Sequence, residues 1–338
     1  MTDHSLIMAT LTADRCTEEF VASMAARGMA GVRINSAHVT PDDIRHICAV
    51  IRSAAPSVRI LMDTKGPELR TTDAPHPVDL RLAESVKVTV GTGPTLPGSI
   101  VINASGSLAE HCRPGMEIAL DDGAVMLRIN SLRGEALETV VTRPGRLESR
   151  KTVVIPDCAL PPLPAVSERD KANIRAGIEA GIDMIAHSFV RSAEDVEAVR
   201  KEIEGTDIQL FAKIECREAL DSFDDILRAA DGLLIARGDL GACVDPADIP
   251  AIQLMVARRC LEARKPSILA TQILQSMIEN PVPTRAEISD IALAVAEGID
   301  WLLLCGETAL GRYPEECVSV MASAILSAEK NSLRCKMI

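Results

Sequence analysis

Short apolar runs alternate with amphipathic segments over most of the chain. Apolar runs of four to six residues are typical of buried parallel strands, and segments with apolar residues every three or four positions are typical of helices. We expect strands at residues 6–10, 30–34, 58–63, 183–187, 210–212, 232–236, 267–271 and 300–305. We expect helices at residues 17–26, 42–54, 169–180, 192–204, 217–229, 250–263, 285–297 and 314–329, with Ser167 as the N-cap of the third. This alternation predicts an α/β protein with a (β/α)8 TIM barrel. A doubly wound open sheet is the alternative, but no glycine-rich fingerprint follows the first strand.

The pattern changes between residues 71 and 152. Helical periodicity disappears, and short alternating runs occupy 85–90, 100–103, 116–120, 124–130 and 136–141, separated by turns rich in Gly, Pro and Asp. Such a pattern is typical of a small antiparallel, β-barrel-like domain. We therefore expect residues 1–70 and 153–338 to form the barrel, and residues 71–152 to form a β lid domain inserted after strand three.

The stretch 210–241, LFAKIECREALDSFDDILRAADGLLIARGDLG, concentrates the candidate chemistry. It is predicted to form a strand, a helix, a second strand and a tight loop that contains glycine. Because both strands of a parallel βαβ unit end on the same side of the sheet, Glu215 and Asp239 are expected side by side, with Lys213 close by. Two carboxylates and one ammonium group predict a site for a divalent cation and a phosphate.

Composition narrows the function classes. The chain has 338 residues, a net charge of −12 and six aromatic residues, which argues against a nucleic-acid partner because phosphate backbones and bases require basic and stacking surfaces. Ten cysteines occur without CxxC spacing, and we expect reduced, mostly buried thiols in a cytoplasmic protein. We find no signal peptide and no apolar run of the roughly 18 residues that a membrane span requires.

Polar residues and glycines follow nearly every predicted strand. They are Arg33, Asn35, Asp63, Thr64, Lys65, His187, Ser188, Lys213, Glu215, Arg237, Gly238, Asp239, Thr271, Gln272, Gly306, Glu307 and Thr308. In a barrel of this kind the chemistry lies at the carboxyl ends of the strands. Polar strand ends also occur without function, and Lys213 with Glu215, or Arg237 with Asp239, could be surface ion pairs. Because several ends carry compatible groups, we favour metal-assisted chemistry on a phosphorylated or oxoacid substrate.

Several segments resemble the signatures of the pyruvate kinase family. They are MDTKGPELR (62–70), AKIE (212–215), ARGDLG (236–241), ATQILQSMIENPVPTRAEISDIALAVAEGID (270–300) and GETALGRYP (306–314). Arg33 and Asn35 with His38 are similar to the family's RLNFSHG segment, and the inserted region resembles its B domain. The chain ends after the last barrel helix, so it resembles a short form without the C-terminal regulatory domain.

The resemblance implies a role for each matching residue. Glu215 and Asp239 would hold Mg²⁺ or Mn²⁺, Lys213 would stabilise the phosphoryl group, and Thr271 lies where the family protonates the enolate. The substrate would contact Arg33, Ser188, Gly238, Asp239 and Thr271. Potassium would be bound by Asn35, Asp63 and Thr64, and ADP or ATP by Asn35, His38, Arg70 and Lys151. Glu68 is the residue type of potassium-dependent members.

The chain also departs from the family's pattern. Ala37 stands where the family has a potassium-ligating serine, and its methyl group cannot coordinate a cation. Ser36, Val39, Cys216, Cys305 and the segment 152–157 also differ, and His187 adds a titratable group at the end of strand four. The phosphoryl and metal side is therefore expected to be whole, and the potassium and nucleotide sides altered.

Three classes of function follow. The first is a kinase acting between phosphoenolpyruvate and ADP in either direction, or, given His187 and the altered 36–39 loop, on another 2-oxoacid. The second is a metal-dependent aldolase or lyase acting on a 2-oxoacid enolate, which would need neither Lys213 nor the inserted domain. The third is a non-catalytic paralogue, suggested by the altered potassium site. In each case we expect a homo-oligomer, with a dimer favoured.

Overall fold

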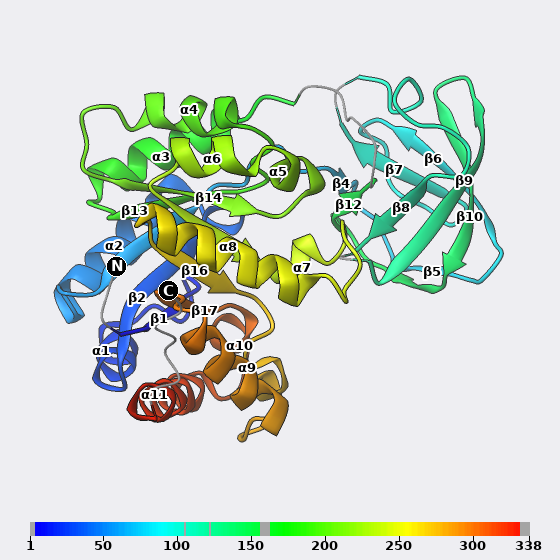
Figure 1. The fold of residues 1–338 in the computed structure, drawn as a ribbon. Coiled ribbons are helices and arrows are strands. Elements are labelled where there is room, and N and C mark those ends of the chain that lie inside the picture. The colour runs from blue at the N-terminus through cyan, green and yellow to red at the C-terminus, as the bar shows by residue number, and fades with distance from the viewer. Residues whose placement is uncertain (1–3, 105, 122, 156–162, 332–338) are drawn as a thin grey trace. The chain divides into compact units, whose positions relative to one another are not determined.

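Eight parallel strands close into a barrel in the computed structural model, which describes residues 4–104, 106–121, 123–155 and 163–331 (Figure 1). In order around the barrel they are β1 (Leu6–Thr10), β17 (Trp301–Leu304), β16 (Ser267–Ala270), β15 (Gly232–Ala236), β14 (Gln209–Ile214), β13 (Met184–His187), β3 (Arg59–Asp63) and β2 (Met29–Asn35). Strands adjacent in this order pair in parallel. The predicted barrel is confirmed, and the open-sheet alternative is wrong.

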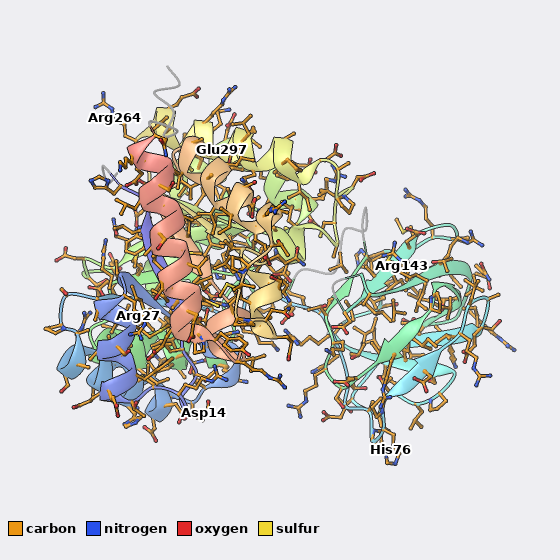
Figure 2. All side chains as sticks on the ribbon, turned by 90° about the horizontal axis from the view of Figure 1, so that it is seen from below. Asp14, Arg27, His76, Arg143, Arg264 and Glu297 are labelled. Atoms are coloured by element: carbon orange, nitrogen blue, oxygen red, sulfur yellow. The ribbon has the colours of Figure 1, made fainter. Side chains whose placement is uncertain are left out.

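Helices follow the strands in the predicted alternation. They are α1 (Glu18–Ala26), α2 (Pro41–Ala54), α3 (Glu168–Glu179), α4 (Ala193–Glu202), α5 (Arg217–Asp221), α6 (Phe223–Ala229), α7 (Arg237–Leu240), α8 (Ile249–Ala263), α9 (Arg285–Ala296), α10 (Gly306–Ala309) and α11 (Pro314–Lys330), with short 3-10 turns η1 (Ser36–His38) and η2 (Gln275–Ile278). The N-cap expected at Ser167 is confirmed, since its hydroxyl accepts from the Asp170 amide in a capping box. At the outer edge of the barrel, Arg27 after α1 pairs with Glu315 of α11 at 2.8 Å (Figure 2).

Two local predictions need correction. The helix expected over 217–229 is two helices, because Ser222 leaves helical geometry (φ −101°, ψ 17°). Its amide donates to the Glu218 carbonyl while its own carbonyl accepts from Ile226, so one helix ends and the next begins there. The loop expected after Ala236 is the short helix α7.

Side chains of the barrel strands alternate between two apolar layers. The interior holds Met8, Leu61, Met184, Ala186, Phe211, Leu234, Ala236, Ile268, Ala270, Trp301 and Leu303. The layer between strands and helices holds their sequence neighbours, such as Ile185, Ala212 and Ile214. Because successive strand residues point to opposite faces, Lys213 points to the interior side and His187 to the helix side.

Residues 67–164, with 238–248, form a second compact unit, and the remaining residues form the barrel unit. The strands of the second unit are β4 (Arg70–Thr71), β5 (Val78–Leu80), β6 (Ser85–Val90), β7 (Ser99–Asn103), β8 (Glu117–Leu120), β9 (Val125–Arg133), β10 (Ala136–Arg143), β11 (Gly145–Leu147) and β12 (Val153–Val154). Seven of them form one sheet in the order β12-β8-β9-β10-β6-β7-β4, and β11 pairs with β5. The expected all-antiparallel pairing is wrong for β6 and β7, which run parallel. The unit extends beyond the expected 71–152, because β4 and β12 both join its sheet.

Two further findings concern the chain as a whole. Eight of the ten cysteines lie in the described residues, where none of the eight forms a disulfide and six are buried. This agrees with the thiols expected from the sequence. No helix in the described part of the chain is long and apolar enough to cross a membrane.

Candidate active site

Four charged side chains meet at the carboxyl ends of β2, β3 and β14. Lys213 Nζ lies 2.7 Å from Glu215 Oε1 and 3.3 Å from Asp63 Oδ2. Arg33 donates to the same Asp63 oxygen from Nε at 2.9 Å and also from Nη2. The cluster is buried, since Lys213 exposes 7% of its surface and Glu215 none. The surface ion pair considered for Lys213 and Glu215 is therefore wrong.

Asp63 is the centre of this cluster. Burial alone would raise the pKa of its carboxyl group, but the nearby charges of Arg33 and Lys213 outweigh burial and lower it. Burial likewise opposes the charge of Arg33, yet the Asp63 carboxylate raises the pKa of the guanidinium. Oδ1 of Asp63 is buried and has no hydrogen-bond partner among the described residues. The cluster therefore stays charged and leaves one carboxylate oxygen for a further donor or cation.

A turn after β13 supports the cluster from one side. Ser188 Oγ accepts a hydrogen bond from Lys213 Nζ at 2.9 Å and donates to the Thr64 carbonyl at 2.7 Å. The Phe189 amide donates to Glu215 Oε2 at 2.7 Å. Phe189 has a left-handed backbone (φ 53°), and a Cβ at Gly66 would come within 2.3 Å of the Ser188 carbonyl oxygen. Both Lys213 and Glu215 are thus held by one tightly packed turn.

Thr271 lies just beyond β16 rather than inside the strand. Both Thr271 (φ 72°) and Gln272 (φ 56°) adopt the left-handed conformation, which is strained for non-glycine residues. Arg237 donates to the carbonyls of Thr271 at 2.9 Å and Gln272 at 3.2 Å, and it pairs with Asp290 of α9 at 2.8 Å. Arg237 thus supports the strained turn.

Sequence reasoning missed two of these partners. The contact between Arg237 and Asp290 joins residues 53 positions apart, and no local pattern announces it. Cys305 lies near Arg33 Nη1, at 3.7 Å from Sγ, and also accepts from the Thr271 backbone. Burial raises the pKa of this thiol. Cys305 therefore connects Thr271 with the charged cluster.

The residues expected at the potassium site are only partly free for that role. Asn35 and Asp63 are register partners on β2 and β3, and Asn35 Oδ1 accepts from the Ala37 amide at 3.2 Å. Asp63 Oδ2 is already shared by two cations, and the Thr64 carbonyl accepts from Ser188. Ala37 adds no oxygen ligand from its side chain.

The other expected site residues are divided between the two units. Arg70 and Lys151 lie on adjacent segments of the second unit, where Arg70 bonds Glu68 at 2.6 Å and Lys151 pairs with Asp121 at 3.1 Å. Gly238 and Asp239 lie in α7 and are also grouped with the second unit. His38 belongs to the backbone of η1 in the barrel unit. Residues 156 and 157 of the altered 152–157 segment lie outside the described residues.

His187 occupies a different place from the one its sequence position suggested. It is fully buried on the helix side of the barrel wall, and Asp195 of α4 and Asp170 of α3 are among its charged neighbours. Its Nδ1 lies 2.8 Å from Thr64 Oγ1. Burial lowers the pKa of its imidazole to about 4. The imidazole of His187 is therefore neutral near pH 7 and lies on the helix side of the barrel wall, away from the barrel interior where Lys213 points.

The donor set suits a divalent cation that is completed by a substrate. Within the described residues no group of three or more His, Cys, Asp or Glu side chains could hold a metal by itself. Magnesium is usually held by one or two carboxylates together with substrate phosphates and water. A buried Glu215, with Asp63 Oδ1 unpartnered nearby, fits such a site.

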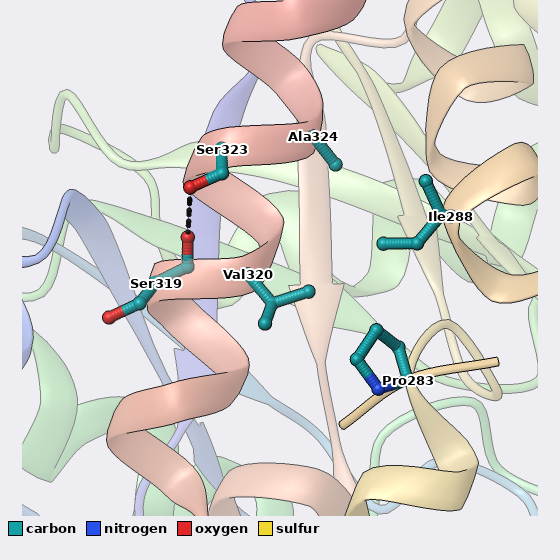
Figure 3. A pocket seen from close by; sticks show the side chains of 6 residues that line it. All are labelled: Pro283, Ile288, Ser319, Val320, Ser323 and Ala324. Atoms are coloured by element: carbon teal, nitrogen blue, oxygen red, sulfur yellow. Dashed lines mark hydrogen bonds between the residues drawn. The ribbon is translucent and has the colours of Figure 1, made fainter. Parts of the chain in front are cut away.

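A surface groove lies elsewhere, between α9 and α11. Its lining is Pro283, Ile288, Ser319, Val320, Ser323 and Ala324 (Figure 3). The only polar side chains there are the hydroxyls of Ser319 and Ser323, the latter bonded to the Ser319 carbonyl at 2.9 Å. The groove offers no charged or metal-ligating group, so it is not the site of the chemistry.

Comparison with known proteins decides the family. The family model described as pyruvate kinase, barrel domain, matches residues 2–318. The chain belongs to the pyruvate kinase family. The pyruvate kinase of Borreliella burgdorferi is 34% identical over 329 residues, which cover 96% of this chain and 68% of the relative. The pyruvate kinase of Geobacillus stearothermophilus is 41% identical over 314 residues, which cover 90% of this chain and 53% of the relative. The pyruvate kinase of Dictyostelium discoideum is 40% identical over 337 residues, which cover 96% of this chain and 66% of the relative.

The chain thus spans between about half and two thirds of the length of these relatives. Pyruvate kinases are transferases of the kinase class, and membership assigns the chain to that class of enzyme. The pyruvate kinase resemblance seen in the sequence motifs is confirmed.

Proposed function

We propose that this enzyme transfers a phosphoryl group between phosphoenolpyruvate and ADP, with pyruvate and ATP as the other pair. The observation that carries the proposal is the buried Lys213 ammonium, held at once by Asp63, Ser188 and Glu215 at the carboxyl end of the barrel. A preorganised cation in a site shielded from water stabilises developing phosphoryl charge far more than an exposed one does.

The reaction needs no covalent intermediate on the protein. In the direction of ATP formation, the bond between phosphorus and the enol oxygen breaks, and a β-phosphate oxygen of ADP forms the new bond to phosphorus. Lys213 and Arg33 would balance the charge on the transferred group. The enolate left behind takes a proton at its methylene carbon, next to the Thr271 turn, and becomes pyruvate.

We assign the remaining roles as the family pattern suggests. Glu215 and Asp239 would hold Mg²⁺ or Mn²⁺, which supplies charge neutralisation for the phosphate and the enolate. Ser188, Gly238 and Asp239 would contact the substrate beside Arg33 and Thr271. Asn35, His38, Arg70 and Lys151 would bind the nucleotide. Asn35, Asp63 and Thr64 would bind potassium.

We test the proposal by following pyruvate formation from phosphoenolpyruvate, ADP, Mg²⁺ and K⁺ with the purified chain. Turnover that Lys213→Ala lowers by roughly 10³-fold or more is expected, because the substitution removes the cation placed at the transferred group. Absence of turnover in the unmodified chain under all four additions contradicts the proposal and favours a binding protein. Cleavage of a 2-oxoacid without any nucleotide would favour the lyase alternative.

We also infer a homo-oligomer, with a dimer favoured, and a cytoplasmic location in keeping with reduced thiols. Within the described barrel unit, the large hydrophobic side chains that are most exposed all come from residues 282–326. They are Val282, Leu293, Leu310 and Leu326, each at least 48% exposed. Light scattering coupled to size-exclusion chromatography tests this, and a monomer at micromolar concentration would contradict it.

A further inference from the structure

His187 is a buried polar side chain that the proposed reaction does not use. It is the last residue of β13 and is completely buried. Its side chain points to the same face of the strand as that of Ile185, two residues earlier, which packs in the layer between strands and helices. It therefore cannot contact a substrate at the interior end of the barrel. Its Nδ1 lies 2.8 Å from Oγ1 of Thr64, the residue that follows β3.

The bond between His187 and Thr64 is one of several that join the ends of β3 and β13, where the Thr64 amide also donates to the Ala186 carbonyl at 3.0 Å. The Ser188 amide donates to Thr64 Oγ1 at 3.1 Å, and Ser188 Oγ donates to the Thr64 carbonyl at 2.7 Å. Thr64 Oγ1 accepts from the Ser188 amide and also lies 2.8 Å from Nδ1 of the neutral imidazole, which donates to the hydroxyl in one tautomer and accepts from it in the other. The imidazole thus sets the orientation of the hydroxyl that holds Ser188.

The joined strand ends carry the turn that positions the active-site charges. Ser188 Oγ receives the hydrogen bond of Lys213, and the next residue, Phe189, donates its amide to Glu215. The imidazole is linked to Ser188 by two hydrogen bonds through the Thr64 hydroxyl, and Ser188 is linked to Lys213 by a third. A shift at His187 would therefore reach the phosphoryl-stabilising cation and the metal-ligand carboxylate together.

This placement of His187 is energetically unfavourable by itself. Nε2 is buried and has no hydrogen-bond partner among the described residues. A buried polar atom without a partner destabilises the folded state, so an apolar side chain of similar size would satisfy packing more easily. Stability alone therefore does not account for a histidine here.

We propose that His187 is a positioning residue of this enzyme, which acts through the Thr64 hydroxyl to fix the Ser188–Phe189 turn and hence Lys213 and Glu215. The inference rests on the proposed function for its kinetic consequence. A displacement of about 1 Å at a reacting group can lower a rate by up to 10²-fold, so the effect falls mainly on kcat.

The test is a double-mutant cycle with His187→Leu, Thr64→Val and both together. Each single change is expected to lower kcat by roughly 10-fold with the KM for phosphoenolpyruvate changed less than about threefold. The double variant is expected to be no slower than the worse single variant, because both changes break the same bond. His187→Asn, whose amide group can take the place of Nδ1 as either donor or acceptor, is expected to restore kcat to within about threefold of the unmodified chain.

Ser5→Ala is the matched structural control. Ser5 is a buried residue of the same unit, and its hydroxyl donates to the Ile299 carbonyl at 2.7 Å near the opposite ends of the strands. Its loss should lower the melting temperature and leave kcat unchanged. If His187→Leu behaves like Ser5→Ala, or if the kcat losses in the cycle are additive, the positioning role is overturned. If His187→Leu does not fold, His187→Ala takes its place in the same cycle, with the same expected loss of kcat and the same non-additivity with Thr64→Val.

A second readout separates this inference from the proposed function. Failure of the unmodified chain to turn over phosphoenolpyruvate and ADP would refute the proposed function. In that event, Mn²⁺ affinity by electron paramagnetic resonance carries the test in the same proteins, because Phe189 holds Glu215 through the same turn. A several-fold, non-additive weakening in His187→Leu and Thr64→Val supports the positioning role, and unchanged affinity overturns it.

Discussion

The two ends of the barrel strands use charged residues in different ways. At the amino ends, Asp183, Asp231 and Asp300 each precede a strand, and each accepts a backbone amide from the neighbouring strand, at 2.6, 2.8 and 3.0 Å. Arg52 pairs with the first and Arg200 with the second, both at the protein surface. These carboxylates are satisfied by the fold itself.

The carboxyl ends show the opposite arrangement. Asp63 and Lys213 are bonded to side chains of other strand ends and of the turn after β13, and Asp63 keeps one buried oxygen without a partner among the described residues. Charges that the backbone does not satisfy are costly unless a ligand completes them. The comparison teaches that the amino-end carboxylates are taken up by backbone amides, whereas the carboxylates of the buried cluster share their oxygens with Arg33 and Lys213: changes to the first should damage stability, and changes to the second should damage activity.

The largest expected effect comes from Glu215→Gln. The amide can still accept the Phe189 hydrogen bond, but the substitution removes the negative charge that we propose binds the divalent cation. We expect kcat/KM at fixed Mg²⁺ to fall by roughly 10³-fold, with Mn²⁺ binding weakened in electron paramagnetic resonance titrations.

Glu307 provides the matched control for this change. It is an equally buried carboxylate near the same strand ends, but its oxygens accept the Leu274 and Cys305 amides at 3.0 and 2.8 Å. Glu307→Gln should lower stability and leave Mn²⁺ affinity intact. Equal losses of Mn²⁺ affinity in both variants would remove the distinction between the two kinds of carboxylate.

The next effect is the dependence of stability on pH that His187 introduces. Its pKa is about 4 in the folded protein and about 6.5 for an unperturbed histidine, because burial disfavours the charged imidazole. The unfolded chain therefore binds the proton first, and the free energy of unfolding should fall as the pH drops from 6.5 to 4. At about 1.4 kcal/mol for each pKa unit, the loss approaches 3 kcal/mol.

Urea unfolding of the unmodified chain and of His187→Asn at several pH values measures this contribution. The asparagine variant should lose less stability over the window, since it has no group to protonate. Parallel curves for the two proteins would mean that His187 does not titrate between these states.

The smallest expected effect lies at the amino ends. Asp231→Ala leaves the buried Leu210 amide without its acceptor and Arg200 without its partner, and we expect a loss of about 1–2 kcal/mol, since the pair is partly exposed to solvent. Asp231→Asn, which keeps an acceptor oxygen, should lose less. Calorimetry measures both, and kcat should stay within about twofold of the unmodified value. A large loss of kcat without a loss of stability would contradict the division between the two ends.

Much of this arrangement could be predicted from local patterns. The apolar runs located all eight barrel strands, and the motifs around Lys213 and Glu215 indicated a site before any family was considered. The break at Ser222 and the helix at Arg237 were not predicted, because propensity at those positions is weaker than the packing of Phe223 and the contacts of Arg237. The strain at Thr271 was equally hidden, since a left-handed threonine has no sequence signal.

The sequence by itself determined the class of fold, the family and the residue types of the site, because strand period, helix period and the family's motifs are all local. The tertiary structure decided which charges meet. Asp63 shares one oxygen between Arg33 and Lys213, and His187 faces the helix layer rather than the substrate, through contacts that join residues 30 to 150 positions apart. Closing the barrel determines those distances, and no local pattern carries them.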